Sequence, residues 1–140
     1  MTEEIDVLVV VDDRWNRVPE SLKNLGKRFK AKLHLLFVRN LQITPEVLTE
    51  LEKKYSSLKE KALKKLQSLA EELKSYGFGT DIVGVHYGIA HERILRESER
   101  IKPDYILVRA RRRPRLWRIL GDYYYDDLFR SSKIPVLVGR

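Results

Sequence analysis

The chain has 140 residues, 43% of them hydrophobic and 34% charged, which is typical of one globular domain with a solvated surface. Its 28 Lys and Arg against 20 Asp and Glu give a formal charge of +8, and the lack of cysteine excludes disulfides, thiolate metal sites and cysteine nucleophiles. No run approaches the roughly 20 apolar residues of a membrane span. The first residues, MTEEID, do not resemble a secretory signal, so we expect a cytoplasmic protein with no membrane partner.

The positive charge is concentrated in one place, which we name the arginine segment. Residues 109–118 read RARRRPRLWR, with six arginines and no acid, so they alone account for +6 of the net charge. The rest of the chain is close to neutral. The net charge therefore reflects one cluster of arginines and does not indicate a uniformly basic surface. The function of this cluster is the question that the charge raises.

The first half of the chain predicts two buried strands and two helices. Residues 5–11 (IDVLVVV) and 33–38 (LHLLFV) are aliphatic runs of the kind covered on both faces in a parallel sheet. A helix between them begins near Pro19, a residue suited to the first helical turn. Its apolar positions at helical spacing are Leu22, Leu25 and Phe29.

A long amphipathic helix follows. Thr44, Pro45 and Glu46 form a strong start, with a capping hydroxyl, a proline and an acid, and Gly77 is suited to the stop. Apolar residues recur every three or four positions between them. They are Leu48, Leu51, Tyr55, Leu58, Ala62, Leu66, Leu69, Leu73 and Tyr76. We favour a face that packs on the domain over a coiled-coil seam.

The second half predicts three further strands, at residues 81–86, 105–108 and 135–138. A helix over 90–102 separates the first two, and a last helix runs from a cap at Asp122 to Arg130. On the helix over 90–102, the residues that should face inward are Ile94, Leu95, Ser98 and Ile101.

Strands alternating with helices predict one α/β domain over residues 1–140. We expect a five-stranded, all-parallel open sheet with helices on both faces. Ligands of such sheets bind beyond the carboxyl ends of the strands, where the strand order reverses. The loops to inspect begin at Asp12-Asp13, Arg39-Asn40 and Arg109.

The acidic pair in VVVDD is also found in Mg²⁺-binding receiver domains, but that reading fails. A receiver needs an aspartate ending its third strand, a hydroxyl ending its fourth and a lysine ending its fifth. The residues near those positions are His86, Arg109 and Gly139, and none of them fits.

Five segments carry a resemblance to a known family. They are VVVDD at the end of the first strand, LHLLFV ahead of the long helix, VHYGIAHERIL before the third helix, IKPDYILV at the fourth strand, and LFRSSKIPVLV at the end. In their order and spacing the chain resembles the universal stress protein family over nearly its whole length. The resemblance implies the five-stranded parallel arrangement of that family and a homodimer that pairs the last strands.

Members of that family that bind ATP carry a loop after the fourth strand with glycine, two residues, glycine, nine residues, then glycine with serine or threonine. Glycines let backbone N–H groups approach the phosphates. Here the resemblance places Arg109 and Arg112 at the first two glycines, and Gly121 or Asp122 at the third, followed by Tyr123. It therefore implies the branch that lacks the ATP motif, and no resident cofactor.

An alternative keeps ATP or another adenine nucleotide as a ligand. Asp12 matches the family aspartate that hydrogen-bonds the adenine side, and Val38 matches a position that lines the base pocket. The candidate nucleotide-binding residues are Asp12, Val38, Val108, Arg109, Arg112, Gly121 and Asp122.

The arginine segment has three readings: a solvated loop or one paired with acids, a site for a phosphate-bearing small molecule, or a nucleic-acid contact. Its anion-binding patch comprises Arg111, Arg113, Arg115 and Arg118. Trp117 and the run Tyr123–Tyr125 could stack on bases, although core packing is commoner for such residues. Asp126 and Asp127 are possible salt partners of the arginines.

Catalysis and metal binding find little support. His86 and His91 lack the spacing of zinc motifs, and His34 within a strand suits a satisfied interior side chain. No nucleophile elbow is present. We therefore expect a protein that is not an enzyme and holds no metal.

The last strand ends in the apolar residues Val136, Leu137 and Val138, and an apolar edge of this kind favours a homodimer. We expect a non-enzymatic stress-response or regulatory dimer. The alternatives are a nucleotide- or phosphate-binding protein that uses Asp12, Val38 and the arginine segment, and a nucleic-acid-binding protein that uses the same arginines.

Overall fold

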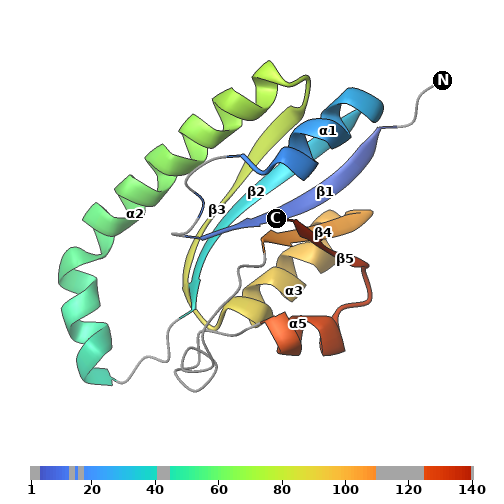
Figure 1. Ribbon diagram of the computed structural model, residues 1–140. Coiled ribbons are helices and arrows are strands. Elements are labelled where there is room, and N and C mark those ends of the chain that lie inside the picture. Colours follow the sequence, from blue (N-terminus) through green and yellow to red (C-terminus); the bar gives the residue numbers. More distant parts are fainter. Residues whose placement is uncertain (1–3, 13–14, 16–17, 41–44, 110–124, 140) are drawn as a thin grey trace.

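The computed structural model describes residues 4–12, 15, 18–40, 45–109 and 125–139, and its five strands form one parallel sheet in the order β3-β2-β1-β4-β5 (Figure 1). The strands are β1 (Ile5–Val11), β2 (Ala31–Asn40), β3 (Gly79–Gly88), β4 (Tyr105–Arg109) and β5 (Val136–Gly139). The helices are α1 (Glu20–Arg28), α2 (Pro45–Ser75), α3 (Ala90–Ile101) and α5 (Tyr125–Ser131). Every strand pair is parallel, so the predicted sheet is confirmed.

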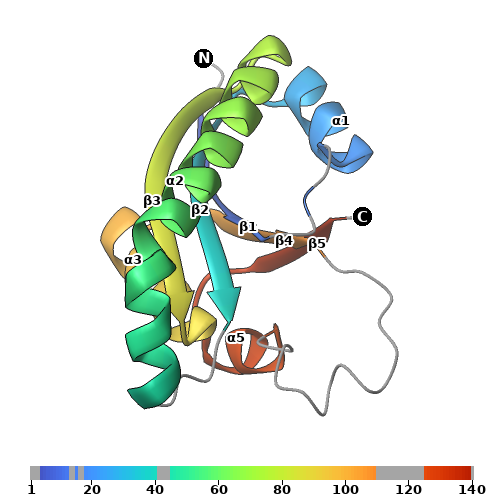
Figure 2. The same cartoon turned by 90° about the vertical axis from the view of Figure 1, so that its left-hand side faces the viewer.

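Helices cover both faces of the sheet (Figures 1 and 2). We call the side with α1 and α2 the α2 face, and the side with α3 and α5 the α3 face. Successive residues of a strand point to opposite faces, so a central strand needs apolar residues at every position. In β1, Val7, Val9 and Val11 join the core of the α2 face, and Leu8 and Val10 join that of the α3 face. This double burial explains the unbroken aliphatic run.

The long helix α2 packs along the α2 face of the sheet. Its buried side chains are Ala62, Leu66, Leu69, Ala70 and Leu73. Leu66 and Leu73 are 0% exposed, which supports the packing face rather than a seam open to a coiled-coil partner. After the helix, Gly77 has a φ of 96°, a left-handed conformation that glycine adopts without a Cβ clash.

A reciprocal pair of hydrogen bonds joins β4 to β1 at their amino ends. The Asp104 backbone N–H donates to the Asp6 carbonyl at 2.7 Å. In return, the Asp6 N–H donates to the Asp104 carboxylate at 2.8 Å. The aspartate before the fourth strand therefore fixes the start of the pairing that brings Val7 opposite Tyr105.

One core assignment was wrong: Phe29 is 54% exposed and is not part of the apolar face of α1. The helix ends at Arg28, and Phe29 is extended, with φ −131° and ψ 142°, as the chain turns toward β2. Its N–H still donates to the Leu25 carbonyl, but its side chain has left the helical face. Helical spacing cannot show where the helix ends.

Other differences are shifts of element ends. The strand predicted at 81–86 extends over Gly79–Gly88, with an irregular register at Leu35 and Leu36 of its partner. In α3, Ile94 and Ser98 are buried as predicted, and Leu95 and Ile101 are partly buried on the α3 face. The predicted cap at Asp122 lies outside the described residues.

Gly26 lies within α1, where alanine is normally more stable by about 1 kcal/mol. A Cβ at this position would come within 2.7 Å and 2.8 Å of the ring of Phe78 and 3.1 Å of the Tyr76 carbonyl. Because the Phe78 ring is buried, we expect Gly26→Ala to lower the free energy of unfolding by about 1–3 kcal/mol in urea denaturation. Gly79→Ala is the control, since its nearest atom would be 3.6 Å away. Equal losses in the two variants would contradict the clash.

Candidate functional site

The strand order reverses between β1 and β4. From β1 the chain adds β2 and β3 on one side of the sheet and later adds β4 and β5 on the other. The crevice at the carboxyl ends of β1 and β4 is therefore where an open α/β sheet binds its ligands. Asp12 follows β1, and Arg109 ends β4. Val9 pairs with Leu107, so the register brings Val11 and Arg109 to the same level of the sheet.

Arg109 points toward the segment that leaves β1. Its guanidinium carbon lies 5.9 Å from the centroid of the Trp15 ring, within cation–π range. Trp15 is 2% exposed, and its backbone N–H donates to the Asp12 carbonyl at 3.2 Å. Three groups thus meet at the reversal point: a carboxylate residue, a buried indole and a partly buried guanidinium.

The indole nitrogen of Trp15 is buried and has no hydrogen-bond acceptor within the described ranges. A buried N–H without an acceptor costs about 1–3 kcal/mol, so native proteins rarely leave one unsatisfied. The segment after β1 therefore contains a buried hydrogen-bond donor in the same ring that the Arg109 guanidinium contacts.

Val38 and Val108, two of the predicted nucleotide-binding residues, lie in the core of the sheet. They are 0% and 1% exposed and belong to the core of the α3 face. Each lies near the carboxyl end of its strand, β2 or β4, one residue before an arginine. Their role in the structure is core packing, and a contact with a ligand stays a prediction.

Most of the predicted site falls outside the residues that the structure describes. These residues are Asp13, Arg111, Arg112, Arg113, Arg115, Trp117, Arg118, Gly121 and Asp122. Of the arginine segment, only Arg109 is placed. Asp12 and Arg109 both contact Trp15, and the other nucleotide and anion contacts stay predictions. Elsewhere, the Nδ1 atom of His91 is 3.9 Å from the carboxylate of Asp127.

Trp15 is the residue at this crevice that the sequence interpretation missed. An aromatic side chain within the otherwise polar stretch DDRWNR was the available signal. Its contact with Arg109 joins positions 94 residues apart in the chain, which local pattern cannot show.

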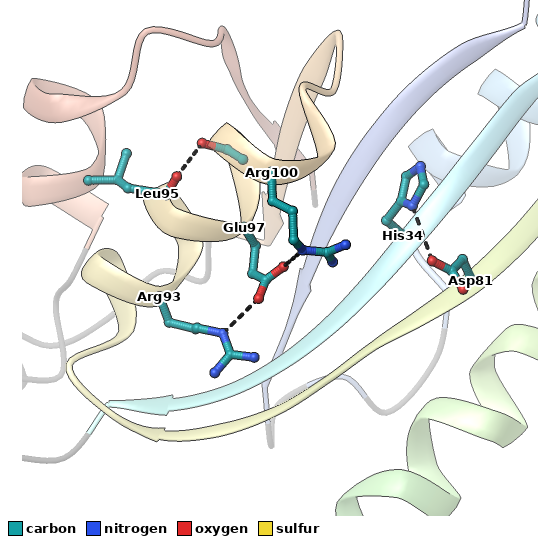
Figure 3. A network of polar contacts seen from close by, with 7 residues as sticks. His34, Asp81, Arg93, Leu95, Glu97 and Arg100 are labelled. Carbon is teal, nitrogen blue, oxygen red and sulfur yellow. Dashed lines mark hydrogen bonds and ion pairs between the residues drawn. The ribbon is translucent and has the colours of Figure 1, made fainter.

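A buried carboxylate on α3 holds two arginines of the same helix (Figure 3). Glu97 is 7% exposed and accepts hydrogen bonds from Arg93 Nε at 3.0 Å and from Arg100 Nε at 2.7 Å. These partners are four residues before and three after it, the spacings that bring side chains together on a helix. The trio satisfies a buried charge and was not singled out from the sequence.

His34 lies between two carboxylates at the other end of the sheet, and Figure 3 shows its contact with one of them, Asp81. Its Nε2 atom is 3.0 Å from Asp6 on β1, and its Nδ1 atom is 3.5 Å from Asp81 on β3, close enough for an ion pair but not aligned as a hydrogen bond. Six residues of β1 separate Asp6 from Asp12, roughly 20 Å at about 3.3 Å per residue. His34 is thus an interior residue, as we expected, and remote from the crevice, but it is satisfied only in part: Nε2 has a hydrogen-bond partner, and the buried Nδ1 atom has none within the described residues.

Two further classes of site find no support in the described part of the chain. Nowhere within it do three or more histidines, cysteines or acids gather in a way that could hold a metal ion. Within the same ranges, no helix has the length and apolar character needed to cross a membrane.

Comparisons with known proteins agree with this fold. The model of the universal stress protein family matches residues 6–140. Among solved structures, hypothetical protein PH0823 has a TM-score of 0.67 at 26% identity, with 96% of this chain and 94% of that chain covered. UspA from Lactobacillus plantarum has 0.63 at 21%, covering 97% of each. A family protein from Arabidopsis thaliana with AMP bound has 0.58 at 17%, covering 96% and 90%. No curated protein matched.

His86, half-buried on β3, has a pKa lowered from 6.5 by burial and by the nearby positive charges of Arg93 and Arg96. We expect Arg96→Gln to raise the pKa of His86 toward 6.5, measured by an NMR pH titration of its ring protons. Arg28→Gln, the same charge change on α1, should leave it unaltered, and equal shifts in both variants would contradict the assignment.

The same group makes stability depend on pH. Because the folded-state pKa lies below the unfolded value, the unfolded chain binds the proton more tightly. The contribution of His86 to stability is therefore full above 6.5 and is lost as the pH falls through the folded-state pKa. Arg96→Gln should weaken that loss.

Proposed function

The chain belongs to the universal stress protein family, and we propose that it is a non-enzymatic stress-response or regulatory protein that does not hold ATP in the manner of the family's glycine loop. The observation that carries the proposal is the position of Arg109. At the residue matched to the first glycine of that loop, a guanidinium instead lies over Trp15 at the point of strand reversal.

An arginine side chain occupies space that a glycine loop leaves open to the phosphates. A glycine loop works because its backbone N–H groups reach the phosphates with no side chain in between. An arginine at the same position fills that space with a long side chain, and Arg109 is anchored over a buried ring. Arg112 replaces the second glycine in the sequence, and Asp122 would repel phosphates.

Two hydroxyls and two imidazoles have contacts within the fold, which supports a role other than catalysis. Ser98 and Ser132 donate to backbone carbonyls within their own segments. His34 lies between Asp6 and Asp81, and His91 lies beside a carboxylate. Nucleophilic catalysis needs a hydroxyl held by a base that a third group orients, and these contacts are of another kind.

A second candidate, an anion- or nucleotide-binding protein, is favoured by the unsatisfied indole N–H of Trp15 beside Arg109. An anionic oxygen would satisfy the indole donor and pair with the guanidinium at once. AMP bound to the Arabidopsis relative supports an adenine nucleotide as the ligand class. In this version Asp12 and Val38 would face the base, and the arginines would replace the backbone N–H groups at the phosphates.

The nucleic-acid alternative rests on the same arginine segment. Binding of that kind would depend steeply on salt, because each phosphate neutralised releases counterions. If the chain binds nucleic acid, its affinity for nucleic acid should fall as the salt concentration rises, and the chain should show no preference for a free nucleotide. The second candidate predicts such a preference.

We also propose a homodimer through β5. This strand lies at the edge of the sheet, and Leu137 and Val138 are 40% and 49% exposed. Phe129 of the preceding helix is 46% exposed as well. An exposed apolar edge strand favours pairing with a second copy, which would cover these side chains and the free backbone groups.

For ATP, ADP and AMP we expect no co-purified nucleotide in mass spectrometry of the denatured protein and no thermal stabilisation. A ligand at 100 times its Kd would add roughly 2.7 kcal/mol to the free energy of unfolding, which thermal denaturation detects readily. A shift with AMP that Arg109→Ala removes would overturn the proposal in favour of the second candidate.

Leu137→Lys should convert the dimer to a monomer in sedimentation equilibrium, because the charge would be buried in the interface. The matched control is Phe29→Lys, since Phe29 is an exposed aromatic 54% accessible at the start of β2 and remote from β5. If the wild-type chain sediments as a monomer, the proposed dimer is wrong.

A further inference from the structure

A hollow lies between α2 and the carboxyl ends of β2 and β3, elements that run side by side in both views (Figures 1 and 2). It has a volume of about 160 Å³ and is lined by Phe37, Arg39, Leu58, Lys61, Ala62, Lys65 and Tyr87. We propose that this hollow, which we name the α2 pocket, binds a phosphoryl group, either as free phosphate or at the end of a small molecule. It is separate from the Asp12 and Arg109 crevice, since β2 and β3 lie on the far side of β1 from β4.

The α2 pocket gathers positive charge. Arg39 comes from β2, while Lys61 and Lys65 lie four residues apart on α2, and no acid is present among the described residues that line the pocket. Lys64, one residue from Lys65, lies beside Glu60, with 3.8 Å between the two charged groups, and is not among the residues that line the pocket.

The types of cation fit a phosphoryl group. A guanidinium offers paired N–H donors that match two phosphate oxygens, and lysine ammonium groups act as point charges on the remaining ones. In a concave site with an apolar wall these charges are screened less than on an open surface, so their potentials add.

The wall and floor of the α2 pocket are rigid and apolar. The rings of Phe37 and Tyr87 pack with centroids 6.4 Å apart, and Phe37 is 2% exposed. The Tyr87 hydroxyl donates to the Leu58 carbonyl at 3.3 Å, which fastens the ring to α2. Ala62 contributes only a methyl group at a buried position of the helix, so space remains where a longer side chain would fill it.

The volume of the α2 pocket limits the size of the group that it can hold. The α2 pocket has a volume of about 160 Å³. Sites for whole small molecules are larger, about 300–1,000 Å³. The α2 pocket therefore suits a phosphoryl group, with any remainder of the molecule outside, and is too small for a complete nucleotide.

The test is a titration of the full chain with inorganic phosphate at constant ionic strength, followed by backbone amide NMR shifts. We expect saturable binding, with shifts at residues 37–39, 58–65 and 87. The double variant Lys61→Gln, Lys65→Gln should lose at least tenfold in affinity. The matched control is Lys59→Gln, Lys64→Gln, which removes the same charge from exposed positions of the same helix and should bind as the wild type does.

Phenyl phosphate distinguishes the two sources of the phosphoryl group. Tighter binding than that of phosphate indicates a small phosphomonoester whose remainder lies at the mouth of the α2 pocket, while equal binding indicates the free ion. Lys61→Gln alone, at an exposed position, provides a folded variant if the double variant does not fold. The proposal is overturned if the wild type shows no saturable binding, or if both double variants weaken it equally.

Discussion

The position of β1 at the centre of the parallel sheet is the constraint on which the rest of the structure depends. It pairs with β2 along its whole length and with β4 on its other side. Both of its faces are covered, so apolar side chains must occupy consecutive positions from Val7 to Val11. Because β2 and β4 flank the same strand, the residues that leave β1 meet the end of β4. The order of the strands in the sheet thus determines that Asp12, Trp15 and Arg109 lie at one place.

The same parallel arrangement separates the roles of the two ends of the sheet. At the amino ends, Asp104 and Asp6 exchange hydrogen bonds, and His34 lies between Asp6 and Asp81, so the polar groups there are engaged with one another. At the carboxyl ends, Arg39 and Asn40 are the last residues of β2 and Arg109 is the last residue of β4. The amino ends hold the strands together, and the carboxyl ends carry cationic side chains.

Most of the fold could be predicted from the sequence, because burial of each strand leaves a dense local signal. The runs at 5–11 and 33–38 and the repeat from Leu58 to Leu73 are of this kind. Phe29 was misassigned because spacing says nothing of where a helix ends. Within the site, Asp12 and Arg109 could be placed, since each follows a predicted strand. The contact of Arg109 with Trp15 could not, because it depends on which strands are neighbours in the sheet.

The positive charges that make up the net charge of +8 are grouped differently in the fold than in the sequence. In the sequence, +6 of this charge lies in residues 109–118, and the other 130 residues sum to only +2. In the folded chain, Lys64 lies beside Glu60, and Lys61, Lys65 and Arg39 line the α2 pocket. Arg39 lies near the end of β2 and Arg109 ends β4, on either side of β1, so two cationic regions share one edge of the sheet. A local sum of charge therefore identifies the arginine segment but misses a second concentration that only the packing of α2 on β2 and β3 creates.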